Sequence, residues 1–99
     1  MILPDHISKK NQMIINRYGL EHQIRKLQEE CAEVIQAGSK YLLAAGMEER
    51  ATKEQDLKME MVDVMVLMDQ IVERIQMTQE EIDTMAMYKI DRTIGRMKK

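Results

Sequence analysis

Apolar side chains recur at steps of three and four residues along two long segments, and this spacing is the strongest constraint on the fold. The first series is Ile24, Leu27, Cys31, Val34, Gly38, Tyr41 and Ala45, and the second is Leu57, Met61, Val64, Met68, Ile71 and Ile75. Such spacing places side chains on one face of a helix. No segment alternates polar and apolar residues as a half-buried strand does, and 4 Gly and 1 Pro are too few for a chain of many turns. The sequence therefore predicts an all-α fold.

The ends of the helices can also be predicted. Residues 1–18 are expected to form a leader and a short helix, Ser8–Tyr18, which ends at Gly19. The first long helix is expected to stop near Gly46. Capping boxes, in which a side chain bonds the backbone three residues later, predict where the other two helices begin. These are Thr52 with Gln55 and Thr78 with Glu81. Because the loops are short, we expect one antiparallel helical bundle over residues 1–99, similar to a four-helix bundle.

Size and charge exclude several classes of protein. A chain of 99 residues buries only part of its surface, so association of copies becomes favourable. The net charge of −2 gives no basic field, and we expect neither duplex nucleic acid nor a membrane as a partner. No apolar run is long enough for a transmembrane helix, and the first residues lack the apolar stretch of a secretory signal. The single Cys excludes an internal disulfide. We expect a cytoplasmic protein.

One stretch of the second long helix, from Met61 to Leu67, is apolar at every position except Asp63. A helix that is apolar on nearly all sides has to be covered on all sides, which the rest of one small chain cannot do. We therefore expect a homo-oligomer that completes the bundle, either a dimer or a tetramer. The same reasoning predicts that Asp63 is buried, where an unpaired charge is strongly unfavourable.

Acidic residues occur at matching positions on the two long helices, three and six residues after a leucine of the apolar face. The pairs are Glu30 and Glu33 after Leu27, and Glu60 and Asp63 after Leu57. If the helices pack side by side, the four carboxylates converge, and their repulsion raises their pKa values. A hard divalent cation such as Mg²⁺ or Mn²⁺ relieves that repulsion, because it prefers carboxylate oxygens as ligands. These four residues are the predicted metal site.

Three further residues of the first long helix say less about function. Glu29 points furthest from the apolar face, so a solvated charge and a role at the site are equally compatible with its position. Cys31 lies on the apolar face and is expected in the core. His22 is isolated from other ligand-type residues and is expected at the surface rather than on a metal.

The two acidic motifs together resemble the signature of a known family. Glu-Glu-x-x-Glu at 29–33, followed by Glu-x-x-Asp at 60–63, is similar to the signature of the MazG-like, all-α nucleoside triphosphate pyrophosphohydrolases, and the gap between them is within the family's usual range. The resemblance extends over residues 18–99. YGLEHQIRKLQEECAEVIQA resembles the family's first long helix, EMVDVMVLMDQI the second, and YKIDRTIGRMKK the carboxy-terminal helix of its small single-domain members.

This resemblance implies Mg²⁺-dependent hydrolysis of a (deoxy)nucleoside triphosphate between its α and β phosphates, which yields a monophosphate and pyrophosphate. The residues that match the family's metal ligands are Glu30, Glu33, Glu60 and Asp63. Glu29 matches an additional acid, which holds a metal or orients the attacking water. Glu29 and Glu30 are thus the candidate catalytic residues, although the identity of the general base stays open.

Several other residues would contact the substrate if the resemblance holds. Basic residues of the family's last helix reach the phosphates, and this role falls on Lys89 and Arg92. Their position is also explained by the helix dipole, which favours cations near a carboxy-terminal end. Lys26 could contact a phosphate or pair with Glu30 one turn later. Gln23 matches a position that lies near the nucleotide.

Other functions remain open at this point. A di-iron or di-manganese bundle needs Glu-x-x-His pairs, which neither long helix contains. A non-catalytic helical interaction module fits the small size and the apolar faces, but it leaves the matched acids unexplained. Within the resembling family, hydrolysis of dUTP or of phosphoribosyl-ATP is compatible with the same motifs.

Overall fold

The computed structural model describes residues 2–98, and within them the backbone forms four α-helices and no strand. The helices are α1 (Asp5–Tyr18), α2 (Leu20–Leu43), α3 (Met47–Arg74) and α4 (Gln79–Met97). The predicted all-α fold is confirmed for this part of the chain. None of these four helices has the length and the apolar character that crossing a membrane requires.

Two glycines with left-handed backbone conformations separate the first three helices. Gly19 (φ 89°) lies between α1 and α2, and Gly46 (φ 81°) immediately precedes α3. Glycine adopts this conformation without the steric penalty of a side chain, so the chain can turn sharply at both positions. α2 ends at Leu43, just before the turn at Gly46, close to where the sequence predicted its end.

The capping box predicted at Thr78 is confirmed, because its hydroxyl accepts a hydrogen bond from the backbone N–H of Glu81 at 3.1 Å. The capping box predicted at Thr52 is wrong. α3 already begins at Met47, and the Thr52 hydroxyl donates to the carbonyl of Glu48 at 3.2 Å inside the helix. Gly46 provides the turn, and the Met, Glu and Arg residues that follow are strong helix formers, so the helix starts there.

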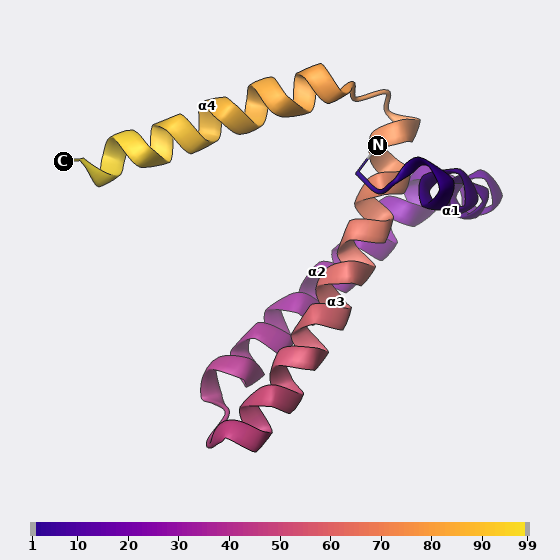
Figure 1. Ribbon diagram of the computed structural model, residues 1–99. Helices are drawn as coiled ribbons and strands as arrows, with labels where there is room; N and C mark the ends of the chain where they lie inside the picture. The colour runs from indigo at the N-terminus through magenta and orange to yellow at the C-terminus, as the bar shows by residue number, and fades with distance from the viewer. Residues whose placement is uncertain (1, 99) are drawn as a thin grey trace.

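α2 and α3 lie side by side in an antiparallel pair, and α1 packs against the end of this pair that is remote from the α2–α3 turn (Figure 1). The buried apolar side chains are few: Ile15, Ala37, Leu67, Ile71 and Val72. Most of them come from the carboxy-terminal half of α3, where α1 and α2 both cover it. The remainder of the α2–α3 pair is a two-helix structure with open sides.

α4 contacts none of the other described helices and extends away from them (Figure 1). No residue of α4 is buried. On α3, the side chains of Met61, Val62, Met65 and Met68 are each between 41% and 53% exposed. The apolar stretch that the sequence predicted to need cover on all sides is therefore covered on one side only, where Leu67 is buried, and open on the other.

A buried carboxylate joins the amino-terminal segment to α3. Asp69 is completely buried and accepts four hydrogen bonds, from the backbone N–H groups of Ile2 (2.8 Å) and Leu3 (3.0 Å), the Ser8 hydroxyl (2.9 Å) and the Asn11 amide (3.0 Å). Burial alone would raise the pKa of Asp69, but these hydrogen bonds outweigh burial and hold the pKa below its usual value.

The hydrogen-bond network continues from Asn11 toward α2. The Gln70 amide donates to Asn11 Oδ1 at 2.8 Å, and the Gln23 amide donates to Gln70 Oε1 at 2.8 Å. Gln23 and Gln70 are 3% and 1% exposed, so α1, α2 and α3 are joined through buried amides. No buried side-chain nitrogen or oxygen in the described residues lacks a hydrogen-bond partner, which is the condition for such a network to stabilise the fold.

Candidate metal centre

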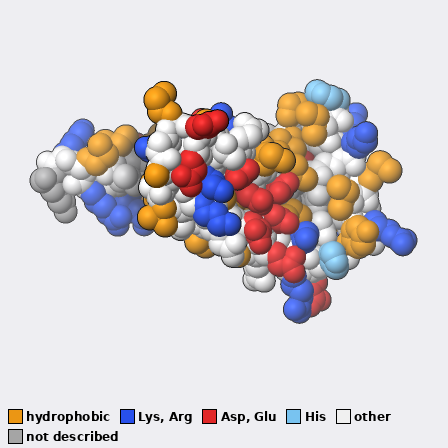
Figure 2. All heavy atoms as spheres, turned by 90° about the horizontal axis from the view of Figure 1, so that it is seen from below, with side chains coloured by type: hydrophobic (Ala, Val, Ile, Leu, Met, Phe, Trp, Pro, Cys, Tyr) orange, Lys and Arg blue, Asp and Glu red, His pale blue; other side chains and the backbone are white. Residues whose placement is uncertain are grey.

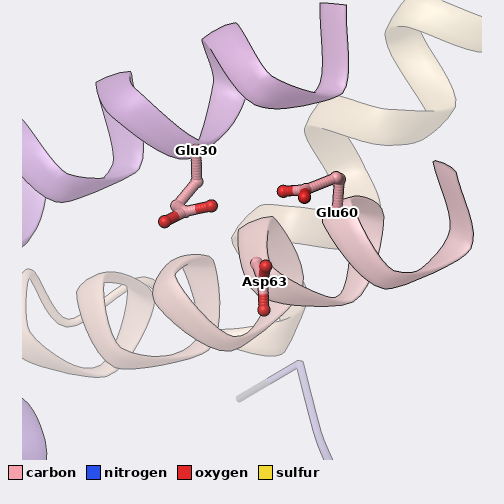
Figure 3. A group of neighbouring side chains, drawn as sticks. All are labelled: Glu30, Glu60 and Asp63. Carbon is pink, nitrogen blue, oxygen red and sulfur yellow. The ribbon is translucent and has the colours of Figure 1, made fainter. Parts of the chain in front are cut away.

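Three carboxylates converge between α2 and α3. Glu30 comes from α2, and Glu60 and Asp63 come from successive turns of α3 (Figure 3). One carboxylate oxygen of each residue lies within 4.8 Å of the corresponding oxygens of the other two. These are three of the four residues that the sequence predicted as metal ligands, and the antiparallel packing of two consecutive helices brings them together.

The packing of α2 on α3 explains this convergence. Leu27 and Leu57 are half-buried on the facing sides of the two helices. Glu30 and Glu60 each follow one of these leucines by three residues and therefore lie at the edge of the same interface, also half-buried. Asp63 lies one turn after Glu60 on the same edge.

The neighbouring carboxylates influence the protonation of Glu60. The pKa of Glu60 is raised, first by its partial burial and then by the negative charges of Asp63, Glu30, Glu33 and Asp56. In the view of Figure 2, acidic side chains gather near the middle of the molecule, with basic side chains beside them. A cation among the carboxylates would favour their ionised forms and reverse this shift.

The donor set fits a hard divalent cation. All three candidate ligands are carboxylates, and neither a thiolate nor an imidazole belongs to the group. Mg²⁺ and Mn²⁺ prefer oxygen ligands, and Mg²⁺ commonly uses a few carboxylates and fills its remaining positions with water or phosphate oxygens. The chemistry of these residues thus suits Mg²⁺ better than Zn²⁺, iron or copper.

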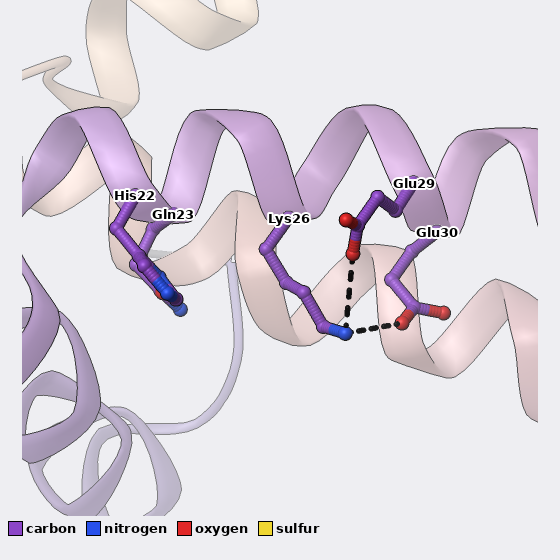
Figure 4. Close-up of polar contacts among 5 residues, drawn as sticks. All are labelled: His22, Gln23, Lys26, Glu29 and Glu30. Carbon is purple, nitrogen blue, oxygen red and sulfur yellow. Dashed lines mark hydrogen bonds and ion pairs between the residues drawn. The ribbon is translucent and has the colours of Figure 1, made fainter.

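Lys26 provides the nearest positive charge to the group. Its Nζ lies 3.3 Å from Glu29 Oε2 and 3.6 Å from Glu30 Oε1 (Figure 4). The hydrogen bond to Glu29 and the charges of Glu29 and Glu30 raise the pKa of Lys26. Glu29 is exposed and engaged by Lys26 rather than by the three-carboxylate group. The ion pair with Glu30 that the sequence allowed for Lys26 is thus present. The phosphate contact that the sequence allowed as the alternative stays a prediction.

Two predicted ligands differ from expectation. Asp63 was expected to be buried, but it is exposed in the described chain, because no further helix of that chain covers this edge of the α2–α3 interface. Glu33 is also exposed and is not a member of the three-carboxylate group. It lies close enough to raise the pKa of Glu60, and the two residues line the same cavity between α2 and α3.

The remaining predicted residues lie away from the carboxylates or serve other contacts. Gln23 is buried in the amide network, and its Oε1 lies 2.7 Å from Nδ1 of the neighbouring His22 (Figure 4). His22 is at the surface, as expected, with its ring 4.9 Å from that of Tyr18. Lys89 and Arg92 are exposed on α4, which contacts neither α2 nor α3 of the same chain.

The expectation that Cys31 lies in the core is wrong, because its side chain is exposed. Cys31 does lie on the apolar face that the helical period indicates, but the other helices cover only a narrow strip of α2. Leu27 and Val34 on this helix are half-buried and Ala37 is buried, whereas Cys31 lies on a part of the helix that no other described helix covers. The helical period indicated a face without indicating how much of that face another helix would cover.

Sequence reasoning did not identify the acid that is actually buried, Asp69. A signal was present, because Asp69 directly follows the apolar run and the next residue, Gln70, is also polar. Polar residues on an otherwise apolar stripe indicate partners elsewhere in the chain. Here these partners are Ser8 and Asn11, which lie three residues apart and on one face of α1.

No family model matches the chain, and comparisons with curated proteins and with solved structures found no match either.

Proposed function

We propose that this protein is a Mg²⁺-dependent nucleoside triphosphate pyrophosphohydrolase of the MazG-like type. The observation that carries the proposal is the convergence of Glu30, Glu60 and Asp63 from two antiparallel helices. The acidic motifs at 29–33 and 60–63 support it independently, because they resemble the family signature in residue type and spacing. A purely structural role leaves this cluster unexplained, since clustered carboxylates repel one another.

In this proposal Glu30, Glu60 and Asp63 hold Mg²⁺, or Mn²⁺ in its place, with Glu33 beside them. The bound cation supplies positive charge that neutralises the triphosphate, activates water and stabilises the leaving pyrophosphate. The chain's own residues then act mainly by position. Lys26 is held beside Glu30 and can donate to a phosphate oxygen, and Glu29, paired with Lys26, can orient the attacking water or accept its proton.

We also propose that the active form is a homo-oligomer. The support is the apolar surface on α3 at Met61, Val62 and Met65, together with a 19-residue α4 that has no partner within its own chain. An isolated helix of this length is marginal in water, so α4 is stabilised only when its apolar side is covered. A second copy can cover both surfaces, and Lys89 and Arg92 of one copy can then approach the carboxylates of the other.

A pyrophosphate-release screen tests this function. The full chain is incubated with canonical and damaged nucleoside triphosphates in the presence of Mg²⁺, Mn²⁺ or EDTA, and the products are separated by chromatography. We expect monophosphate and pyrophosphate, formed only with metal, and no diphosphate or orthophosphate. A Glu30→Gln preparation, which lacks one cluster carboxylate, controls for contaminating phosphatases. No metal-dependent release from any nucleotide would reject the proposal and favour the interaction module.

A further inference from the structure

The cavity that Glu33 and Glu60 line is charged, and it lies beside the three-carboxylate group, toward the α2–α3 turn. It has a volume of about 210 Å³ and lies between α2 and α3. The charged residues that line it are Glu33, Lys40, Lys53, Asp56 and Glu60. Glu60 belongs to the three-carboxylate group as well, so the cavity and the candidate metal centre are continuous.

Two lysines from opposite helices face this cavity. Lys40 lies near the end of α2, and Lys53 lies in the second turn of α3. Among the described residues neither lysine forms an ion pair or a hydrogen bond, although three carboxylates line the same cavity. Lys26 and Lys58, by contrast, are each paired with a glutamate on their own helix. Lys40 and Lys53 are therefore available to an anion from outside the protein.

The cavity on the other side of the carboxylates has a different character. Its volume is about 260 Å³. Besides Glu30 and Asp63, it is lined by three apolar side chains and two amides, those of Ile14, Val66, Leu67, Gln23 and Gln70. Its one cation, Lys26, is already paired with Glu29 and Glu30. The groove between α2 and α3 is thus asymmetric: one end has two unpaired lysines, and the other has mostly apolar side chains and amides beyond the carboxylates and Lys26.

We propose that Lys40 and Lys53 form a phosphate-binding site that holds the pyrophosphate end of the substrate. This inference rests on the proposed function and adds a direction to it, because the charged end of the substrate then lies toward the α2–α3 turn. A lysine ammonium is a common point-charge ligand for phosphate. The cavity is several times the volume of roughly 30 Å³ that one water occupies in the liquid, so a diphosphate can enter.

The acids in the cavity make this site dependent on metal. Glu33 and Asp56 repel a free anion, but a phosphate that arrives with a divalent cation brings the charge that they attract. Lys40 and Lys53 then contact the oxygens that point away from the cation. We therefore expect pyrophosphate to bind with Mg²⁺ present and to bind far more weakly with EDTA.

Isothermal titration with inorganic pyrophosphate tests this site without requiring hydrolysis. The full chain, a Lys40→Gln/Lys53→Gln variant and a Lys9→Gln/Lys10→Gln control are titrated in Mg²⁺. The control removes the same charge from exposed positions on α1, which does not line the cavity. We expect the Kd to rise at least about tenfold for the cavity variant and to change less than about twofold for the control. A Lys40→Arg/Lys53→Arg variant should retain binding.

Two outcomes would overturn the phosphate site: no binding of pyrophosphate by the full chain, or equal binding by the full chain and the cavity variant. A parallel titration with a non-hydrolysable triphosphate analogue should show the same loss of affinity in the cavity variant. Failure of the proposed enzyme function has a different signature. In that case pyrophosphate binding would still depend on the lysines, while no nucleotide would be hydrolysed.

Discussion

The Asn11 side-chain amide donates to Oδ2 of Asp69 at 3.0 Å and also to the backbone carbonyl of Val66 at 2.8 Å. The two residues are on α1 and α3, and both are buried. Asn11 thereby attaches α1 to the turn of α3 that follows the candidate metal ligands. Its carbonyl oxygen accepts from Gln70, so the same side chain also links the carboxylate to the amides that reach α2.

Replacement of Asp69 should destabilise the protein strongly. In Asp69→Asn, an NH₂ group replaces one carboxylate oxygen. It cannot accept the hydrogen bonds that this oxygen accepts in the natural chain. Leaving buried donors unpaired costs about 1–3 kcal/mol of unfolding free energy. For a domain of this size, each kcal/mol lowers Tm by roughly 4–8 °C. Thermal melts of Asp69→Asn and of the exposed Asp91→Asn measure the difference. Equal Tm values for the two variants would contradict the structural role of Asp69.

Stability should fall in acid because of the same residue. The pKa of Asp69 is lower in the folded protein than the value of 3.8 expected for an unpaired Asp, so the unfolded chain binds the proton more tightly. The contribution of Asp69 is therefore complete above that value and is lost as the pH falls through the folded-state pKa. Urea denaturation at about pH 6 and about pH 3 should show a smaller acid loss for Asp69→Asn than for the natural chain. The opposite order would mean that the Asp69 pKa is not lowered.

The sequence predicted well which segments are helical and on which side of each helix the acidic residues lie, because both depend on local spacing. The positions three residues after Leu27 and Leu57 were enough to bring Glu30 and Glu60 to one edge of the interface. The helical period does not encode how far two helices cover each other, and the errors for Cys31 and Asp63 have this common origin. Both side chains lie where no other helix of the same chain covers them.

The buried amide network could not be predicted by the same reasoning. Gln23 was interpreted as a nucleotide contact from the resemblance, and Asn11 was not singled out at all. Their partners lie 47 to 59 positions away in sequence. A single sequence gives no indication of which distant polar residues meet. The overlap at Gln23 is informative, since this residue also lines the cavity next to the carboxylates and could affect ligand binding through the network.

Divalent metal should stabilise the protein through the three carboxylates. A ligand that binds only the folded state adds about 2.7 kcal/mol at roughly a hundredfold excess over its Kd. Melts with Mg²⁺, Mn²⁺ or EDTA measure this effect. A Glu60→Gln/Asp63→Asn variant should lose the rise in Tm with metal. It should keep or gain stability without metal, because two of the carboxylates that repel one another are gone. Glu33→Gln should keep most of the response, since Glu33 lies outside the group. If the double variant still responds fully, the carboxylates are not the metal site.

Association should depend on the uncovered surface of α3. Val62 is 53% exposed and lies on the outer side of the helix. A charge there would be buried on association, so Val62→Glu should yield monomers at micromolar concentration, as measured by light scattering. Glu54→Gln, on the same helix but within an exposed ion pair with Lys58, should leave the oligomer intact. A natural chain that is monomeric and fully folded would contradict the proposal that a second copy covers this surface.

The final prediction separates the chemical step from binding of the substrate. Asp63→Asn should lower kcat by at least about a hundredfold, the scale lost when a preorganised charged group is removed from a site. Lys89→Ala and Arg92→Ala should instead raise KM as well as lower kcat/KM, because part of a phosphate contact already exists in the ground state. Their Tm should change little, since both side chains are exposed. Steady-state kinetics with the best nucleotide from the screen measures all three. Unchanged kinetics in Lys89→Ala and Arg92→Ala would mean that these residues do not contact the substrate and that α4 serves only to pack against a second copy. An active Asp63→Asn enzyme would contradict the metal mechanism itself.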